Sequence, residues 1–181
     1  TCALPIYGNL LDIGCGTGAF LNEMRSSGWK IKGLEPDGQA SQNAKSLYGI
    51  DTLPSEHLFK LNSEKFDAIT MWHVLEHVHQ LHEYMSELHQ LLAEEGRLFI
   101  AVPNYTSYDA SFYQSDWAAY DVPRHLYHFS PKSMEILGAK NNFKVVETKK
   151  MLFDSTYVAM LSEQYKNGKG NLVAALWHGT M

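Results

Sequence analysis

The stretch Asn9–Leu21 reads NLLDIGCGTGAFL, and it decides the fold of this chain. It opens with strand-forming apolar residues and continues directly into a glycine-rich turn. The glycines stand at the spacing G-x-G-x-G: Gly14, Gly16 and Gly18. Glycine tolerates positive φ and has no Cβ, so this backbone can turn sharply and lie against a ligand. The stretch therefore predicts a strand, a ligand-binding turn and the start of a helix.

The glycine spacing differs from that of dinucleotide-binding proteins. Those proteins carry G-x-G-x-x-G, rest the pyrophosphate on the helix N-terminus and use the last glycine to pack the helix against the strand. An ordinary strand-to-helix turn is the alternative interpretation of a glycine loop taken alone. The ligand predicted for this loop need not carry phosphate.

An acidic residue follows the next predicted strand. Trp29–Glu35 is predicted as a short strand that ends at Glu35, about 20 residues beyond the glycines. A carboxylate at that position can accept hydrogen bonds from both ribose hydroxyls of a nucleoside. Glu35 therefore favours a nucleoside-containing ligand over an ordinary turn.

The motif D-I-G-C-G-T-G, followed by an acid after the second strand, resembles the first motif of class I S-adenosylmethionine-dependent methyltransferases. The resemblance implies S-adenosyl-L-methionine as the cofactor. It also implies that Asp12 orients the methionine end through the amino group or a water, and that Pro36 and Asp37 flank the adenine. The loop, Cys15 included, is expected to pack under the sugar and the amino-acid moiety.

A third segment, from Glu64 to Val78, begins with a predicted strand, Phe66–Trp72, and continues as H-V-L-E-H-V. This pattern resembles the fourth strand and its loop in ubiquinone-type and related small-molecule methyltransferases. Open α/β sheets bind ligands at the carboxyl ends of strands, where the strand order reverses. Trp72 and His73 are therefore expected to line the methionine end of the cofactor.

The alternation of predicted strands and helices is typical of an α/β, Rossmann-like fold, with a mostly parallel sheet flanked by helices on both faces. The strands expected after the first are Trp29–Glu35, Ile50–Leu53, Phe66–Trp72, Arg97–Val102 and Phe143–Thr148. The helices expected are Gly18–Arg25, Asp37–Tyr48, one from Leu81 that stops at Gly96, one opened by Ser130 and Pro131, and Ser155–Tyr165.

The ends of the chain are expected to depart from the family pattern. Thr1–Ile6 resembles the translation of a sequencing-library adapter, so residues 1–7 are interpreted as a non-native leader. Residues 8–181 are expected to form one methyltransferase-like domain. Related enzymes have a helix before the first strand and one more strand at the end, so this domain is interpreted as truncated, without the cap helix and the last strand.

Composition narrows the function classes. The chain has 181 residues, 45% of them hydrophobic, which is enough for one core. Its net charge of −5 and its lack of a Lys/Arg cluster argue against a nucleic-acid partner. Two cysteines favour the reducing cytoplasm over a disulfide scaffold. No run of 18 apolar residues predicts a membrane span, and the oligomeric state stays open.

Methyl transfer from a sulfonium is an in-line displacement that depends more on alignment than on a strong catalytic group. A hydroxyl or amine acceptor also needs a base, and histidine is the natural candidate. The candidates are His73 and His125. His125 lies in a segment, H-L-x-x-F-S, that resembles the substrate side of one methyltransferase subfamily. The alternative is that Arg124 and His125 only hold this loop in place.

A metal site is a competing interpretation of the H-V-L-E-H-V segment. His73, Glu76 and His77 stand at i, i+3 and i+4, so one helical turn can present all three. Some ubiquinone-type O-methyltransferases resemble this segment and hold a divalent ion there, but they have a glutamate at the position of His73. We therefore expect no metal, with Glu76 capping the turn and His77 packed.

The segment Asn104–Tyr120 is rich in aromatic residues and is expected to cover the acceptor site or to pack its own loop onto the fold. Together the motifs predict S-adenosylmethionine-dependent methyl transfer to a small-molecule acceptor at oxygen, nitrogen or carbon. The alternatives are an NAD(P)-dependent oxidoreductase and a non-catalytic S-adenosylmethionine-binding fragment.

Overall fold

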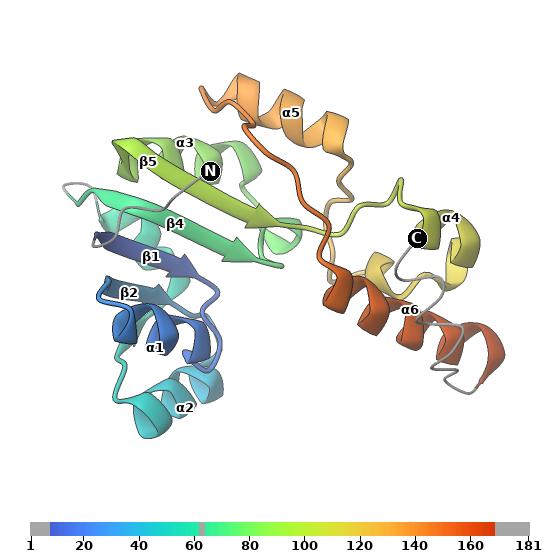
Figure 1. The fold of residues 1–181 in the computed structure, drawn as a ribbon, viewed down its shortest axis with the longest axis horizontal. Helices are drawn as coiled ribbons and strands as arrows, with labels where there is room; N and C mark the ends of the chain where they lie inside the picture. The colour runs from blue at the N-terminus through green and yellow to red at the C-terminus, as the bar shows by residue number, and fades with distance from the viewer. Residues whose placement is uncertain (1–7, 62–63, 169–181) are drawn as a thin grey trace. The chain divides into compact units, whose positions relative to one another are not determined.

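A computed structural model describes residues 8–61 and 64–168 of the chain (Figure 1). By its internal contacts the chain divides into two compact units, one ending at Val102 and the other beginning at Pro103. The expectation of a single domain over residues 8–181 stays a prediction. None of the helices in the described part of the chain combines the length and the apolar character that a membrane crossing requires.

The first unit is built on a parallel sheet of five strands. The strands are β1 (Asn9–Ile13), β2 (Lys30–Leu34), β3 (Thr52–Leu53), β4 (Phe66–Trp72) and β5 (Leu92–Ala101). Their order is β3-β2-β1-β4-β5, and every pair is parallel. The strand order reverses between β1 and β4, so the carboxyl ends of these two strands form the switch point. The predicted α/β, Rossmann-like fold class is confirmed.

Three α-helices connect the strands: α1 (Ala19–Ser26), α2 (Gly38–Tyr48) and α3 (Leu81–Leu91). Two short 3₁₀ turns, η1 (Ser55–Lys60) and η2 (Leu75–His77), flank β4. Figure 1 shows α1 and α2 at the β2 end of the sheet and α3 beside β5. The sequence fits this arrangement, because α3 buries an apolar stripe at helical spacing: Tyr84, Met85, Leu88 and Leu91.

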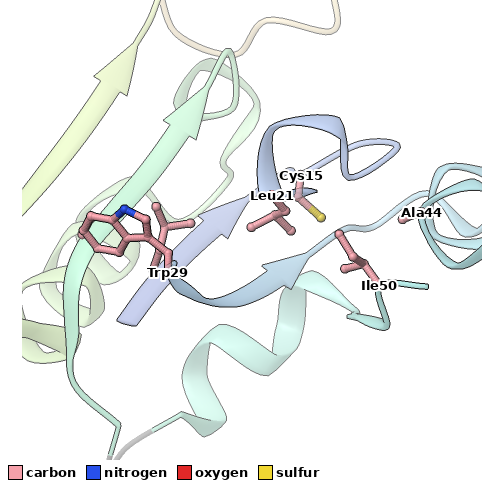
Figure 2. Packing of buried hydrophobic residues seen from close by; sticks show 7 residues of the cluster. Cys15, Leu21, Trp29, Ala44 and Ile50 are labelled. Carbon is pink, nitrogen blue, oxygen red and sulfur yellow. The ribbon is translucent and has the colours of Figure 1, made fainter. Parts of the chain in front are cut away.

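A hydrophobic cluster holds α1 and α2 against the sheet (Figure 2). Its buried members are Leu10, Cys15, Leu21, Trp29, Ala44, Ile50 and Ala68. Leu21 and Cys15 meet over Gly33 of β2, where an added Cβ would lie 2.6 Å from Leu21 Cδ1 and 2.7 Å from Cys15 Sγ. This close approach of loop and helix to the strand fixes the position of the glycine turn.

The second unit is helical. It contains α4 (Tyr108–Tyr113), the 3₁₀ turns η3 (Gln114–Asp116) and η4 (Ala118–Tyr120), α5 (Pro131–Lys140) and α6 (Leu152–Asn167). α5 begins as expected, with Ser130 as N-cap in a capping box and Pro131 as its first residue.

Buried and partly buried hydrogen bonds stabilise the second unit. The Tyr113 hydroxyl donates to Glu163 Oε1 at 2.9 Å, and Trp117 Nε1 donates to Asp109 Oδ2 at 2.9 Å. The Ala118 N–H donates to Ser162 Oγ at 2.9 Å. Since Glu163 and Ser162 belong to α6, two of these bonds tie α6 to the turn-rich segment that contains α4 and η4.

Two expected elements differ from the structure. The helix from Leu81 ends at Leu91 instead of reaching Gly96, and β5 begins at once. A register shift opposite Phe66 and Ala68 lets β5 start early, and Gly96 lies inside this irregular part of the strand. The expected strand Phe143–Thr148 is absent: the Phe143 N–H instead closes the end of α5 on the Gly138 carbonyl, and these described residues form no ladder.

Candidate functional site

The glycine turn closes on the end of β2. The N–H groups of Gly14 and Cys15 both donate to the Leu34 carbonyl, at 2.8 and 3.1 Å. Gly14, Gly16 and Gly18 all have positive φ, at 71°, 55° and 78°. The loop is therefore fixed by backbone hydrogen bonds in a conformation that other residues rarely adopt.

The space available for a side chain differs between Gly14 and Gly16. A Cβ at Gly14 would lie 2.5 Å from Val74 Cγ2, whereas a Cβ at Gly16 would meet nothing within 4 Å. Gly14 is thus required for packing against the loop after β4. Gly16 faces open space, which is the property expected of a backbone that receives a ligand.

Glu35 points its carboxylate at this loop. Oε2 accepts a hydrogen bond from the Gly16 N–H at 2.7 Å, and Oε1 accepts one from the Asp37 N–H at 2.9 Å. A carboxylate offers about four lone-pair positions, so two remain after these bonds. The predicted ribose-binding acid is therefore held in one orientation and keeps the capacity to accept two hydroxyl groups.

Pro36 and Asp37, expected beside the adenine, are exposed after β2. Asp37 is also the N-cap of α2, since its Oδ1 accepts a hydrogen bond from the Ala40 N–H at 2.7 Å. The carboxylate of Asp37 thus has a structural role of its own. Its contact with adenine stays a prediction.

Asp12, at the carboxyl end of β1, is 1% exposed. Its Oδ1 accepts a hydrogen bond from Thr70 Oγ1 at 2.6 Å, whereas its Oδ2 is buried and has no hydrogen-bond partner among the described residues. Burial raises the pKa of Asp12 to about 6; the Thr70 hydrogen bond opposes this rise and the charge of Glu35 adds to it. The site therefore contains an acid that titrates close to neutral pH.

Cys15 lies in the loop but directs its side chain into the core, as Figure 2 shows. Burial raises the pKa of the thiol to about 12, and the charges of Asp12 and Glu35 act in the same direction. A thiol that stays protonated is a poor nucleophile. Its part in the predicted ligand site is restricted to the backbone.

Trp72 and His73 stand where β4 ends. The Trp72 ring packs edge-to-face on Phe20 with centroids 5.6 Å apart, and its Nε1 is buried without a hydrogen-bond partner in the described chain. His73 has a positive φ of 56°, and its N–H donates to the Ala101 carbonyl at 3.0 Å. A non-glycine residue in this conformation marks backbone strain of the kind that clusters at functional sites.

The H-V-L-E-H-V segment differs in detail from the expectation. Glu76 is 1% exposed, caps no helix, and has neither carboxylate oxygen hydrogen-bonded within the described residues. Its Oε1 lies 3.6 Å from His73 Nδ1, which is longer than a hydrogen bond. His77 is exposed instead of packed. The roles expected for Glu76 as a cap and His77 as a packed residue are both wrong.

His125 belongs to the second unit, and its side chain is 10% exposed. Its Nδ1 lies 2.9 Å from the Ala119 carbonyl, which can only accept, so Nδ1 carries the proton. The other ring nitrogen, Nε2, lies 3.8 Å from Asp121 Oδ2. The bond to Ala119 ties the ring to its own loop, which is the alternative role expected for this residue, and the part of His125 as a base stays a prediction.

The structure thus gathers Asp12, the three glycines and Glu35 around one turn. It adds Thr70, which the sequence analysis did not single out. The available signal was a hydroxyl residue within the apolar part of β4, residues 68–72. The structure places it opposite Asp12 in the parallel register. The carboxylates of Asp12 and Glu35 thus offer hydrogen-bond acceptors beside the turn, and the groups that donate to them in the described residues are two backbone N–H groups and one hydroxyl.

Comparison with known proteins agrees with this geometry. The sequence pattern of the methyltransferase domain family matches residues 4–148. The chain belongs to this family. As a methyltransferase domain it confirms the resemblance drawn from its glycine loop, Glu35 and the segment after Phe66.

Relatives of this methyltransferase domain include the bovine mitochondrial ubiquinone biosynthesis O-methyltransferase, 28% identical over 83% of this chain and 45% of that protein. The ubiquinone biosynthesis O-methyltransferase of Nitrosococcus oceani is 25% identical over 94% of this chain and 75% of its own length. The chain spans about half the length of the first curated relatives it matches.

Among solved structures, an S-adenosylmethionine-dependent methyltransferase from Thermotoga maritima superposes with a TM-score of 0.64 at 24% identity, over 80% of this chain and 67% of that one. A methyltransferase from Archaeoglobus fulgidus gives 0.63 at 19% identity, over 87% and 77% of the two chains. At these identities the likeness establishes the Rossmann-like fold of the methyltransferase domain.

Proposed function

We propose that this chain binds S-adenosyl-L-methionine at the Gly14–Gly18 turn and transfers its methyl group to a small-molecule acceptor. The observation that carries the proposal is the Glu35 carboxylate, which is held by the Gly16 and Asp37 N–H groups and keeps two lone-pair positions for a ribose diol. Family membership supports the same assignment.

The charges of the site favour this cofactor over a dinucleotide. In dinucleotide-binding folds the pyrophosphate lies at the glycine loop. Here the Gly16 N–H already donates to the partly buried Glu35, and Asp12 adds a buried carboxylate. An anionic pyrophosphate would lie against these acids, whereas the sulfonium and ammonium groups of S-adenosylmethionine are cationic. The NAD(P)-dependent alternative has no comparable support.

The acceptor class is proposed from the relatives and the candidate bases. The relatives are named O-methyltransferases, so a hydroxyl acceptor is the first class to test, with nitrogen and carbon acceptors still open. A hydroxyl must lose its proton as the methyl group arrives. We assign that step to His125 or His73, because histidine is the side chain that most often serves as a general base.

The partner class and the cellular compartment are proposed from composition. The net charge of −5 favours a small molecule over a nucleic acid. The low cysteine content favours a cytoplasmic setting, although the animal relatives are named mitochondrial.

Calorimetric titration of the 181-residue chain tests the cofactor. S-adenosylhomocysteine is expected to bind with a micromolar or tighter dissociation constant, and NAD⁺ is expected to give no heat. Transfer of a labelled methyl group is then measured with a panel of catechol, amine and carbon-acid acceptors. Binding of NAD⁺ in place of S-adenosylhomocysteine would overturn the proposal, and binding without transfer to any acceptor would favour the non-catalytic alternative.

A further inference from the structure

Thr70 and Asp12 are neighbours across the switch point of the sheet. They are register partners of β4 and β1, and both are buried, at 3% and 1% exposure. Thr70 Oγ1 lies 2.6 Å from Asp12 Oδ1 and 3.4 Å from the Leu11 carbonyl oxygen. A hydroxyl group has one proton to donate. The shorter contact, to the carboxylate, takes that proton while Asp12 is ionised.

This bond makes the two oxygens of Asp12 unequal. Oδ1 is held by Thr70, whereas Oδ2 is buried without a hydrogen-bond partner in the described residues. An unpartnered buried acceptor is costly, and a ligand that brings a donor removes the cost. Within the described residues, the charge that acts on Asp12 is that of Glu35, which is an anion. The missing donor is therefore best supplied by a positively charged ligand group.

We propose that Thr70 is a positioning residue of the cofactor site: its hydroxyl fixes the Asp12 carboxylate so that Oδ2 accepts a hydrogen bond from the α-ammonium group of the cofactor. This assignment rests on the proposed function, because it takes S-adenosylmethionine to be the molecule at the glycine turn. It concerns recognition of the amino-acid moiety and leaves the adenosine contacts of Glu35 unchanged.

The same hydroxyl serves both protonation states of Asp12. When Asp12 is neutral, its proton can lie on Oδ1 and be donated to Thr70 Oγ1, while the Thr70 proton turns toward the Leu11 carbonyl. Arrival of the ammonium group favours the ionised carboxylate, and the released proton passes to bulk water. Serine retains both arrangements at this position, whereas valine has the shape of threonine and retains neither.

The test compares two ligands on three proteins. S-adenosylhomocysteine carries the α-amino-acid moiety, and 5′-methylthioadenosine lacks it but shares the adenosine and the sulfur. In T70V, the affinity for S-adenosylhomocysteine at pH 7.5 is expected to fall by about tenfold, the effect of one charged hydrogen bond, while that for methylthioadenosine changes less than about twofold. T70S is expected to bind both ligands like the unmodified chain.

The pH dependence gives a second readout. Acidification should weaken S-adenosylhomocysteine binding as Asp12 becomes protonated, and in T70V this loss should begin at higher pH, because the hydrogen bond that favours the ionised form is gone. Methylthioadenosine binding should lack this dependence on Thr70.

T52V is the matched control. Thr52 also has a partly buried hydroxyl contact, 2.6 Å from Ser41 Oγ, but lies on β3. T52V should leave the ratio of the two affinities unchanged. Equal weakening of both ligands by T70V, no weakening of either, or the same loss in T70S would overturn the assignment; T70A, which also lacks the hydroxyl, takes the place of T70V if T70V does not fold. Failure of the unmodified chain to bind S-adenosylhomocysteine would instead overturn the proposed function itself.

Discussion

Glu35 Oε2 accepts the N–H of Gly16 at 2.7 Å, so the acid that follows β2 also closes the glycine turn that follows β1. One side chain thus serves both as the proposed ribose acceptor and as a tie between two segments 19 residues apart. The carboxylate is already oriented before a ligand arrives, which lowers the entropy cost of binding. This double role decides how variants of Glu35 should be interpreted.

Glu35→Gln should weaken S-adenosylhomocysteine binding by about 1.5–3 kcal/mol, because one acceptor oxygen becomes an NH₂ donor and the charge is lost. Glu35→Ala should weaken it at least as much and should also lower the melting temperature, since the Gly16 and Asp37 N–H groups lose their acceptor. Calorimetry and thermal melting measure the two effects. Glu64→Gln is the control, because Glu64 is bonded to Lys32 instead of the loop. An unchanged dissociation constant in both Glu35 variants would refute the ribose contact.

Gly14→Ala and Gly16→Ala should have different effects, because Gly14 packs against Val74 whereas Gly16 faces open space. Both glycines have positive φ, which costs alanine about 1–2 kcal/mol. At Gly14 the new Cβ also collides with Val74, which adds about 1–3 kcal/mol. Urea unfolding should therefore show the larger loss for Gly14→Ala, whereas Gly16→Ala should lose S-adenosylhomocysteine affinity with the smaller loss of stability. The reverse order of stabilities would contradict this account of the turn.

Asp12 should make the folded state less stable as the pH rises from about 4 to 6. The pKa of Asp12 is raised by burial from 3.8 to about 6, so the unfolded chain loses its proton first and ionisation of the folded chain then costs about 3 kcal/mol. This contribution is fully present below pH 3.8 and is lost once the pH passes about 6. Asp12→Asn removes the titration and keeps an oxygen for Thr70.

The check is the difference in the free energy of unfolding between the unmodified chain and Asp12→Asn, measured by urea titration at pH 4, 5, 6 and 7. As the pH rises, the free energy of unfolding of Asp12→Asn should increase relative to that of the unmodified chain. This change should level off above pH 6. Asp51→Asn, a change at an exposed carboxylate, should show no such trend. A flat difference across this range would mean that the Asp12 pKa is not raised in the folded state.

His125→Asn tests the base against the loop-holding role. The asparagine NH₂ group can replace Nδ1 as a donor to the Ala119 carbonyl, but no basic nitrogen remains. If His125 is the base, the turnover number with a hydroxyl acceptor should fall by about 10²–10⁴-fold while the affinity for S-adenosylhomocysteine is unchanged. Retained turnover in His125→Asn together with lost turnover in His125→Ala would show that the ring only holds the loop.

The sequence predicts local parts of this fold well and non-local parts poorly. The strand and helix around the glycine turn, β2 and β4 have strong local signals, and their predicted bounds agree with the structure within two residues. The change from α3 to β5 at Leu91 has no glycine or proline to mark it, so Gly96 was taken for the stop. Strand propensity around Val145 cannot say whether a partner strand exists, and no strand forms there.

In the candidate site too, residues with a local sequence signal could be predicted and non-local contacts could not. Asp12 and Glu35 could be found because each stands at a fixed distance from the glycines. The Thr70 contact depends on which strand lies beside β1, and the burial of Glu76 depends on how the turn after β4 folds back. Both are products of tertiary structure, so the sequence pattern alone assigned Thr70 no role and placed Glu76 in the wrong one.

The contacts of α6 set a limit on how far the second unit can be shortened. Glu163 accepts a hydrogen bond from the Tyr113 hydroxyl, and Ser162 accepts one from the Ala118 N–H. Ala159 packs in the hydrophobic cluster that contains Tyr113. A version of the chain that ends before Ala159 would leave one buried and one partly buried donor without these acceptors, and it would expose one side of the aromatic cluster. Expression boundaries drawn after Asn167 keep that wall intact, and boundaries drawn before Ala159 invite aggregation.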